Sequence, residues 1–239
     1  RSVGYANAPE DVVSAYVAAT AAVAHAGAGA EGLRWVYTAM HGVGWETFAQ
    51  VLDAAGYPRP TTVTEQLEPD GLFPAVAFPN PEEPGALDLA YEAATASNAE
   101  LIIAHDPDAD RLAVALPEGE ADARSWRRLT GNEVGLLLGW RAAREAAAAG
   151  GADASASLAC SLVSSPGLRV IAEHYGLSAH ETLTGFKWIS RAPGMIFGFE
   201  EALGYLVNPE TVRDKDGVSA AIAILGLATA ARAEGRTLA

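Results

Sequence analysis

Apolar and polar residues follow two distinct patterns along the chain, which predict a series of helices and strands. Apolar residues three and four positions apart predict amphipathic helices, and short apolar runs between turn residues predict buried strands. The helical pattern covers residues 11–25, 45–55, 87–97, 133–148, 167–174 and 218–232. The strand pattern covers residues 33–39, 61–64, 101–104, 112–116, 158–163, 181–183 and 195–199. Strands separated by helices are typical of layered α/β domains.

A polar segment, residues 117–128, divides this pattern into two similar halves. We therefore expect two consecutive, similar α/β domains, residues 1–118 and 129–239, each a mixed sheet packed with helices. The chain has 239 residues and half of them are hydrophobic, so each domain has enough apolar material to bury a core of its own.

The run from His105 to Arg111, with the sequence HDPDADR, is the strongest chemical signal in the chain. It places Asp106, Asp108 and Asp110 at alternate positions after an apolar strand, so their side chains can point to one side. Carboxylates held close together repel one another unless a positive charge lies among them, and hard divalent cations prefer carboxylate oxygen. The planar guanidinium of Arg111 is suited to a phosphate. The run therefore predicts a cation site beside a phosphate-binding arginine, which is the local chemistry of phosphoryl transfer.

Other interpretations of this run fit its residues less well or stay open beside it. An acidic surface turn stays open, because Asp and Pro are common in turns. A calcium loop of the EF-hand type beginning at Asp106 is excluded, because its sixth and twelfth positions require Gly and Glu but are Arg111 and Pro117. A phosphatase with an aspartate nucleophile is disfavoured, because such a motif has Thr or Val at the position of Asp110.

Two further groups of residues are candidates for binding a sugar phosphate. Glu200 and Glu201 lie in a glycine-bounded loop after an apolar strand, where their carboxylates could accept hydrogen bonds from sugar hydroxyls. A surface turn with paired glutamates is the alternative. Lys187 could reach a phosphate as a mobile charge or remain a solvated lysine. Lys215, between two aspartates, is either a substrate contact or a surface ion pair.

Structural roles explain several other polar residues. Ser164 and Ser165 precede Pro166, so we expect them to cap the following helix.

Cys160, the single cysteine, excludes an internal disulfide and suits a reducing cytoplasm, where we expect the protein to be located. The formal net charge of −14 argues against a nucleic-acid partner, which would require a basic face. No apolar run is long enough to span a membrane, so we expect no membrane partner.

The acidic run resembles the metal-binding loop of the α-D-phosphohexomutases, the phosphoglucomutase and phosphomannomutase family. Further stretches resemble that family in the expected order: YTAMHGVG at 37–44, TGFKWI at 184–189, GFEEALGY at 198–205 and RDKDG at 213–217. They are similar, in turn, to the opening of its second domain, a loop of its third domain, its sugar-binding loop and the stretch after that loop. The resemblance covers most of the chain and implies domains II and III, which share one α/β topology.

The resemblance implies an isomerase that moves a phosphoryl group between the 1- and 6-positions of a hexose phosphate, with a hexose 1,6-bisphosphate as intermediate and activator. It implies Mg²⁺ held by Asp106, Asp108 and Asp110, with Arg111 steadying the phosphoryl group. Its implied substrate contacts are Thr184, Gly185, Lys187, Glu200, Glu201 and Lys215.

Two motifs of the family are absent from this sequence: the TASHNP-like loop, whose serine carries the phosphoryl group, and the RxSGTEP-like phosphate-binding loop. We therefore expect the chain to be the middle of a four-domain enzyme, with domains I and IV as its partners, and to be inactive alone. Many members of the family have Ser at the position of Ala202. In this respect the chain looks more like the subgroup that includes phosphopentomutase-like enzymes. A non-catalytic fragment that binds metal and sugar phosphate is the alternative, and the preferred sugar stays open.

Overall fold

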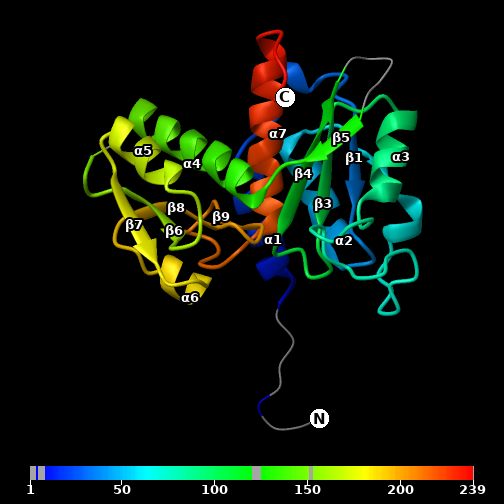
Figure 1. The fold of residues 1–239 in the computed structure, drawn as a ribbon, viewed down its shortest axis with the longest axis horizontal. Helices are drawn as coiled ribbons and strands as arrows, with labels where there is room; N and C mark the ends of the chain where they lie inside the picture. Colours follow the sequence, from blue (N-terminus) through cyan, green and yellow to red (C-terminus); the bar gives the residue numbers. More distant parts are fainter. Residues whose placement is uncertain (1–3, 5–8, 120–124, 151–152, 239) are drawn as a thin grey trace.

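The computed structural model describes residue 4 and residues 9–119, 125–150 and 153–238. Its first unit is a five-stranded sheet in the order β2-β1-β3-β4-β5 (Figure 1). The strands are β1 (Trp35–Thr38), β2 (Thr61–Thr62), β3 (Leu101–His105), β4 (Leu112–Glu118) and β5 (Ser125–Arg128). Strand β1 is parallel to both β2 and β3, whereas β4 is antiparallel to both β3 and β5. The sheet is therefore mixed, as the sequence predicts.

Helices cover both faces of this first sheet. The elements are the helices α1 (Glu10–Ala21), α2 (Gly44–Ala55) and α3 (Asp88–Ala96) and the short 3-10 helices η1 (Ala28–Ala30) and η2 (Thr64–Gln66). Alternate strand residues point to opposite faces. Val36 and Ile102 therefore pack against Ala90 and Ala94 of α3, whereas Ile103 joins the larger core on the other face.

The second unit is a four-stranded mixed sheet in the order β7-β6-β8-β9. Its strands are β6 (Ser157–Ser161), β7 (Ser178–Thr182), β8 (Met195–Glu200) and β9 (Gly204–Leu206). The helices after β5 are α4 (Gly131–Ala148), α5 (Gly167–His174), α6 (Phe186–Ile189) and α7 (Gly217–Ala233). Strand β6 is parallel to β7 and β8, and β8 forms an antiparallel hairpin with β9. The predicted architecture of two α/β units, each with a mixed sheet, is confirmed.

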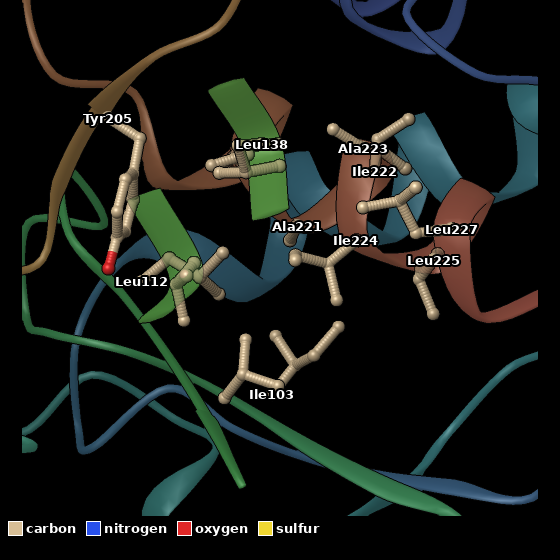
Figure 2. Close-up of a cluster of buried hydrophobic side chains, with 14 of the residues drawn as sticks. Ile103, Leu112, Leu138, Tyr205, Ala221, Ile222, Ala223, Ile224, Leu225 and Leu227 are labelled. Carbon is tan, nitrogen blue, oxygen red and sulfur yellow. The ribbon is translucent and has the colours of Figure 1, made fainter. Parts of the chain in front are cut away.

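Helix α7 joins the two units into one core. It stands between them in Figure 1 and contacts η1, α1, α2, β3 and β4 of the first unit as well as α4 and β9 of the second. Its residues are apolar on nearly all sides, which is the pattern of a helix surrounded by protein. Figure 2 shows Ile222 and Ile224 of α7 in one buried cluster with Ile103, Leu138 and Tyr205. Apolar residues of both halves therefore share one core through α7, and the limits of the two domains stay a prediction.

Both ends of α7 are fixed by the first unit. At the start, Asp216 accepts hydrogen bonds from the amides of Val218 (3.1 Å) and Ser219 (3.3 Å), and the hydroxyl of Tyr16 in α1 donates to it at 2.8 Å. Near the end, Arg232 donates to the carbonyls of residues 29, 31 and 32 and pairs with Glu100 at 3.1 Å. These contacts place the first residues of α7 beside the end of β3.

Several elements differ from the sequence prediction. Residues 125–128 of the predicted polar boundary form the edge strand β5, which was missed because Ser125, Arg127 and Arg128 are polar. The middle of that boundary, residues 120–124, lies outside the described residues. The predicted loop at 184–189 contains α6, and β9 was not predicted; both are too short for periodicity to reveal. Helix α1 ends at Ala21 rather than at residue 25.

Replacing Gly29 by Ala should destabilise the protein, because its Cβ would lie 2.0 Å from the backbone oxygen of Thr229 in α7. Forcing packed backbones apart costs roughly 1–3 kcal/mol. Gly27→Ala is the matched control, because a Cβ there meets no atom within 4 Å. Urea unfolding should give a lower midpoint for Gly29→Ala alone. Equal midpoints for the two variants would contradict the close packing of η1 on α7.

Candidate active site at the junction of the two units

The three aspartates of the acidic run converge at the end of β3. Asp106, Asp108 and Asp110 each offer one carboxylate oxygen, and these oxygens lie within 4.8 Å of one another. Asp106 is buried, Asp110 is half-buried and Asp108 is exposed. Ala109 adopts a left-handed backbone conformation with a φ of 58°, which turns the loop so that the side chains on either side of it approach. The convergence predicted from the spacing is therefore present in the acidic loop, residues 106–111.

Arg111 holds Asp106 in place. The Arg111 backbone amide donates to Asp106 Oδ1 at 3.0 Å, and its Nε donates to Oδ2 at 2.6 Å. Burial nevertheless raises the pKa of Asp106 above its ordinary value, against the lowering effect of Arg111, and the charge of Asp108 adds to the rise. A cation between these carboxylates would offset that cost, because it favours the deprotonated form.

The second unit contributes Glu200 and Lys215 to the same place. Lys215 Nζ lies 2.7 Å from Asp110 Oδ2, so it forms an ion pair across the junction. Glu200 is the last residue of β8, and burial raises its pKa, while the charge of Lys215 and a hydrogen bond from the Gly185 backbone oppose the rise. A cleft of about 280 Å³ is lined by Asp106, Asp108, Asp110, Arg111, Glu200, Ala202 and Lys215.

Backbone hydrogen bonds connect the acidic loop to the second unit. The Leu112 amide donates to the carbonyl of Leu203 at 3.1 Å, and the Gly217 amide donates to the carbonyl of Ala109 at 3.1 Å. Leu203 and Ala109, the two acceptors, are both left-handed, with φ of 64° and 58°. Such a conformation is unfavourable for residues other than Gly and persists only where the surroundings impose it. The junction is therefore a specific contact that fixes the two halves of the cleft.

The side chain of His105 supports this junction through two hydrogen bonds. Its Nε2 lies 3.0 Å from the Gly217 carbonyl, which can only accept, so Nε2 carries the hydrogen. Its Nδ1 then accepts from the Tyr37 hydroxyl at 3.0 Å. Burial lowers the pKa of His105 to about 4, so the ring is neutral and donates at one nitrogen only. The imidazole thereby links β1, β3 and the start of α7.

Gly204 allows the side chains of the second unit to approach the junction. A Cβ at this position would lie 2.8 Å from Lys215 Cδ, 2.9 Å from Phe186 Cε2 and 3.0 Å from Glu200 Cγ. The absence of a side chain therefore lets Lys215 and Glu200 pass over the backbone of β9 into the cleft.

The predicted site residues are not all brought together. The three aspartates, Arg111, Glu200 and Lys215 line one cleft. Thr184 and Lys187 are exposed beside it, with Lys187 at the start of α6 rather than on a loop. Glu201 is directed to two serines, so its carboxylate does not line the cleft. The substrate contacts expected of Thr184, Gly185, Lys187 and Glu201 therefore stay predictions.

Sequence reasoning missed several residues that shape the site. His105 was a visible signal, because a polar residue ends an otherwise apolar strand directly before Asp106. The partners Tyr37 and Gly217 carried no such signal, since they are distant in sequence. The expectation that Ser164 and Ser165 cap α5 is wrong: Pro166 is the N-cap and receives no side-chain cap hydrogen bond, Ser165 accepts only from the Gly167 amide at 3.2 Å, and Ser164 binds Glu201.

The donor set fits a hard divalent cation and a phosphorylated sugar. Three converging carboxylates supply oxygen ligands, Arg111 and Lys215 supply positive charge for a phosphate, and Glu200 supplies an acceptor for hydroxyls.

No helix among the described residues is long and apolar enough to cross a membrane.

Comparison with known proteins assigns the chain to a family. Residues 14–119 match the family described as phosphoglucomutase/phosphomannomutase, alpha/beta/alpha domain II, and residues 130–239 match its domain III. The chain is 52% identical over 239 residues to the probable phosphomannomutase of Haemophilus influenzae, covering 100% of this chain and 47% of that protein. It is 42% identical over 209 residues to the phosphopentomutase of Homo sapiens, covering 82% of this chain and 34% of that protein. The chain thus spans less than half the length of each relative.

The fold is similar to a crystal structure of a phosphoglucomutase/phosphomannomutase family protein from Burkholderia thailandensis. The TM-score is 0.74, over 92% of this chain and 44% of that chain. Sequence identity is 18%, so this likeness concerns the fold alone. The two family matches and the 52% identity along the whole chain show more than the fold, because they also assign the chain to a family. The chain belongs to the phosphoglucomutase/phosphomannomutase family and comprises its second and third α/β/α domains.

Proposed function

We propose that this chain is the metal- and sugar-binding middle of a magnesium-dependent phosphohexomutase, which moves a phosphoryl group between the 1- and 6-positions of a hexose phosphate. The supporting observation is the single cleft that joins the acidic loop of the first unit to Glu200 and Lys215 of the second. A cation site and a carboxylate suited to sugar hydroxyls therefore face the same space. The phosphoserine and the final phosphate-binding loop belong to domains I and IV, outside this chain.

Asp106, Asp108 and Asp110 are the residues that would hold the magnesium ion. Magnesium prefers oxygen ligands and keeps several waters, so three carboxylates suffice. When bound, the ion supplies positive charge that neutralises charge developing on a phosphoryl group. Arg111 orients Asp106 through its amide and Nε, and its terminal guanidinium nitrogens can bind a phosphoryl oxygen.

Lys215 and Glu200 are the residues that would contact the sugar. Lys215 Nζ is paired with Asp110 in this structure, where its charge balances the carboxylate. With a cation held by the acidic loop, Lys215 would be free to contact a substrate phosphate or hydroxyl. Glu200 accepts hydrogen bonds from sugar hydroxyls, and its burial strengthens them because water competes less. Thr184, Gly185 and Lys187 extend the binding surface toward α6.

A phosphopentomutase-like specificity is the second candidate. Ala202 lines the cleft beside Glu200, where it offers no hydroxyl to a sugar. The human relative that is 42% identical bears the name phosphopentomutase. Comparing kcat/KM of the complete protein for ribose 1-phosphate, glucose 1-phosphate and mannose 1-phosphate separates the two specificities.

Asp108→Ala should weaken magnesium binding at the acidic loop by at least about tenfold, because even losing a residue that merely supports a metal ligand costs that much. Calorimetry on the 239-residue chain measures this affinity. Glu92→Ala is the control, because Glu92 is exposed on α3 and outside the cleft. If both variants bind magnesium with the same affinity, the run is only an acidic surface turn.

Glu200→Gln should reduce kcat/KM of the complete parent protein on glucose 1-phosphate about a hundredfold. The amide keeps the shape but loses the charge that strengthens about two hydrogen bonds, each contributing roughly 1.5–3 kcal/mol. A coupled assay with magnesium and glucose 1,6-bisphosphate measures it, with Glu92→Gln as the control.

The same assay tests the proposed function as a whole. The unaltered parent protein should turn over glucose 1-phosphate, whereas the 239-residue chain should not, because it lacks the serine that carries the phosphoryl group. Robust turnover by the chain alone, or full activity of Glu200→Gln, would contradict this assignment.

A further inference from the structure

Glu201 is bound to two serines of the neighbouring strand and loop. Ser161 Oγ, at the end of β6, donates to Glu201 Oε2 at 3.1 Å, and Ser164 Oγ donates to the same oxygen at 3.0 Å. The two serine oxygens lie 2.8 Å apart. The Glu201 amide donates back to Ser164 Oγ at 3.1 Å. Ser161 is fully buried and Ser164 nearly so, which protects these bonds from water.

The backbone of Glu201 is held as closely as its side chain. A Cβ on Gly131, the first residue of α4, would lie 1.8 Å from the Glu201 carbonyl oxygen. The start of α4 thus rests directly against the turn. Asn132 Oδ1, the next residue, accepts from the Ser165 amide at 2.7 Å, which ties the serine loop to the same helix. Glu201 is therefore fixed by β6, by the loop after it and by α4.

The turn after Glu200 has three residues, 201–203, because Glu200 pairs with Gly204 across the hairpin. A left-handed third residue is a common solution for hairpin loops of this length, and Leu203 has it. Leu203 bonds to Leu112 of the first unit. The turn is therefore anchored at both ends, by Glu201 to the second unit and by Leu203 to the first, with Ala202 between them in the cleft.

We propose that Glu201 is a positioning residue rather than a sugar ligand: its clamp by Ser161 and Ser164 holds the turn so that Glu200 and Ala202 face the substrate. This inference rests on the proposed function, because it concerns how the sugar is held. The two glutamates point in different directions: Glu200, the last residue of β8, faces the cleft, whereas Glu201, the first residue of the turn, faces Ser161 and Ser164.

The clamp predicts that Glu201 and the serines act as one unit. Glu201→Ala and the double variant Ser161→Ala/Ser164→Ala should each lower kcat/KM of the complete parent protein about tenfold, since each removes both hydrogen bonds that the Glu201 carboxylate accepts, and the serine variant also removes the bond from the Glu201 amide. Combining all three substitutions should cost no more than the double serine variant alone, as for residues that share one interaction. Magnesium affinity should be unchanged, because Asp106 is held by Arg111 within the acidic loop and none of the three aspartates contacts Glu201 or the two serines.

Two variants serve as controls. Glu201→Gln should restore most of the activity lost in Glu201→Ala, because the amide oxygen still accepts from both hydroxyls. Ser165→Ala lies in the same loop without touching Glu201 and should retain its activity. If Glu201 binds the sugar directly, the pattern differs. The double serine variant should then stay active, and any small loss that it causes should add to the loss in Glu201→Ala. That pattern would overturn the proposal.

Hydrogen exchange on the 239-residue chain tests the clamp without any assay of activity. Amides of residues 199–206 should exchange faster in Glu201→Ala and in the double serine variant, but not in Ser165→Ala. Unchanged exchange in the first two variants would also overturn the proposal. An inactive unaltered parent protein would contradict the proposed function instead, and the exchange rates would still decide whether the clamp holds the turn.

Discussion

The candidate site depends on one constraint, the backbone contacts that join the acidic loop and the start of β4 to the β8–β9 hairpin and the start of α7. Two amides, of Leu112 and Gly217, donate to carbonyls on opposite sides of the junction. The acceptors, Leu203 and Ala109, keep a left-handed backbone that costs of order 1–3 kcal/mol at each residue. That strain is sustained because the packed core on both sides leaves these residues little freedom. Without this junction the carboxylates and Glu200 would belong to separate surfaces.

Helix α7 supplies the rigidity that the junction requires. Its first residue, Gly217, donates to Ala109 and accepts from His105, and the helix is then buried as far as Thr229 except at Gly226. A Cβ on Gly217 would lie 2.4 Å from the Arg111 carbonyl oxygen, so only Gly lets the helix begin this close to the acidic loop. A helix that completes one core and positions one site couples the stability of the protein to the geometry of its cleft.

The sequence predicts the parts of the site that lie close together along the chain. Asp106, Asp108 and Asp110 converge as expected, because they lie within five residues of one another, although the left-handed turn at Ala109 that brings them together also involves the distant Gly217. The position of the Glu201 side chain is not predictable from the sequence, because Ser161 and Ser164 lie 40 and 37 positions away, Ser161 in a predicted strand and Ser164 as an expected helix cap. The shared core was missed for a similar reason. The apolar pattern of α7 shows that it is buried but does not show which sheet covers it.

Two opposite charges, on Lys215 and Asp110, meet at the edge of the cleft. Lys215 neutralises Asp110 in this structure, and a cation in the acidic loop would take over that role. Cation binding and sugar-phosphate binding should therefore assist each other, since the cation releases a lysine for the phosphate. By linkage the assistance is reciprocal.

The most direct test is the affinity of the 239-residue chain for glucose 1,6-bisphosphate, measured by calorimetry with and without magnesium. We expect magnesium to raise this affinity about tenfold, within the typical range for coupled sites, and Lys215→Ala to abolish most of the increase. An affinity that is the same with and without magnesium would show that the acidic loop and the sugar-binding residues do not form one site.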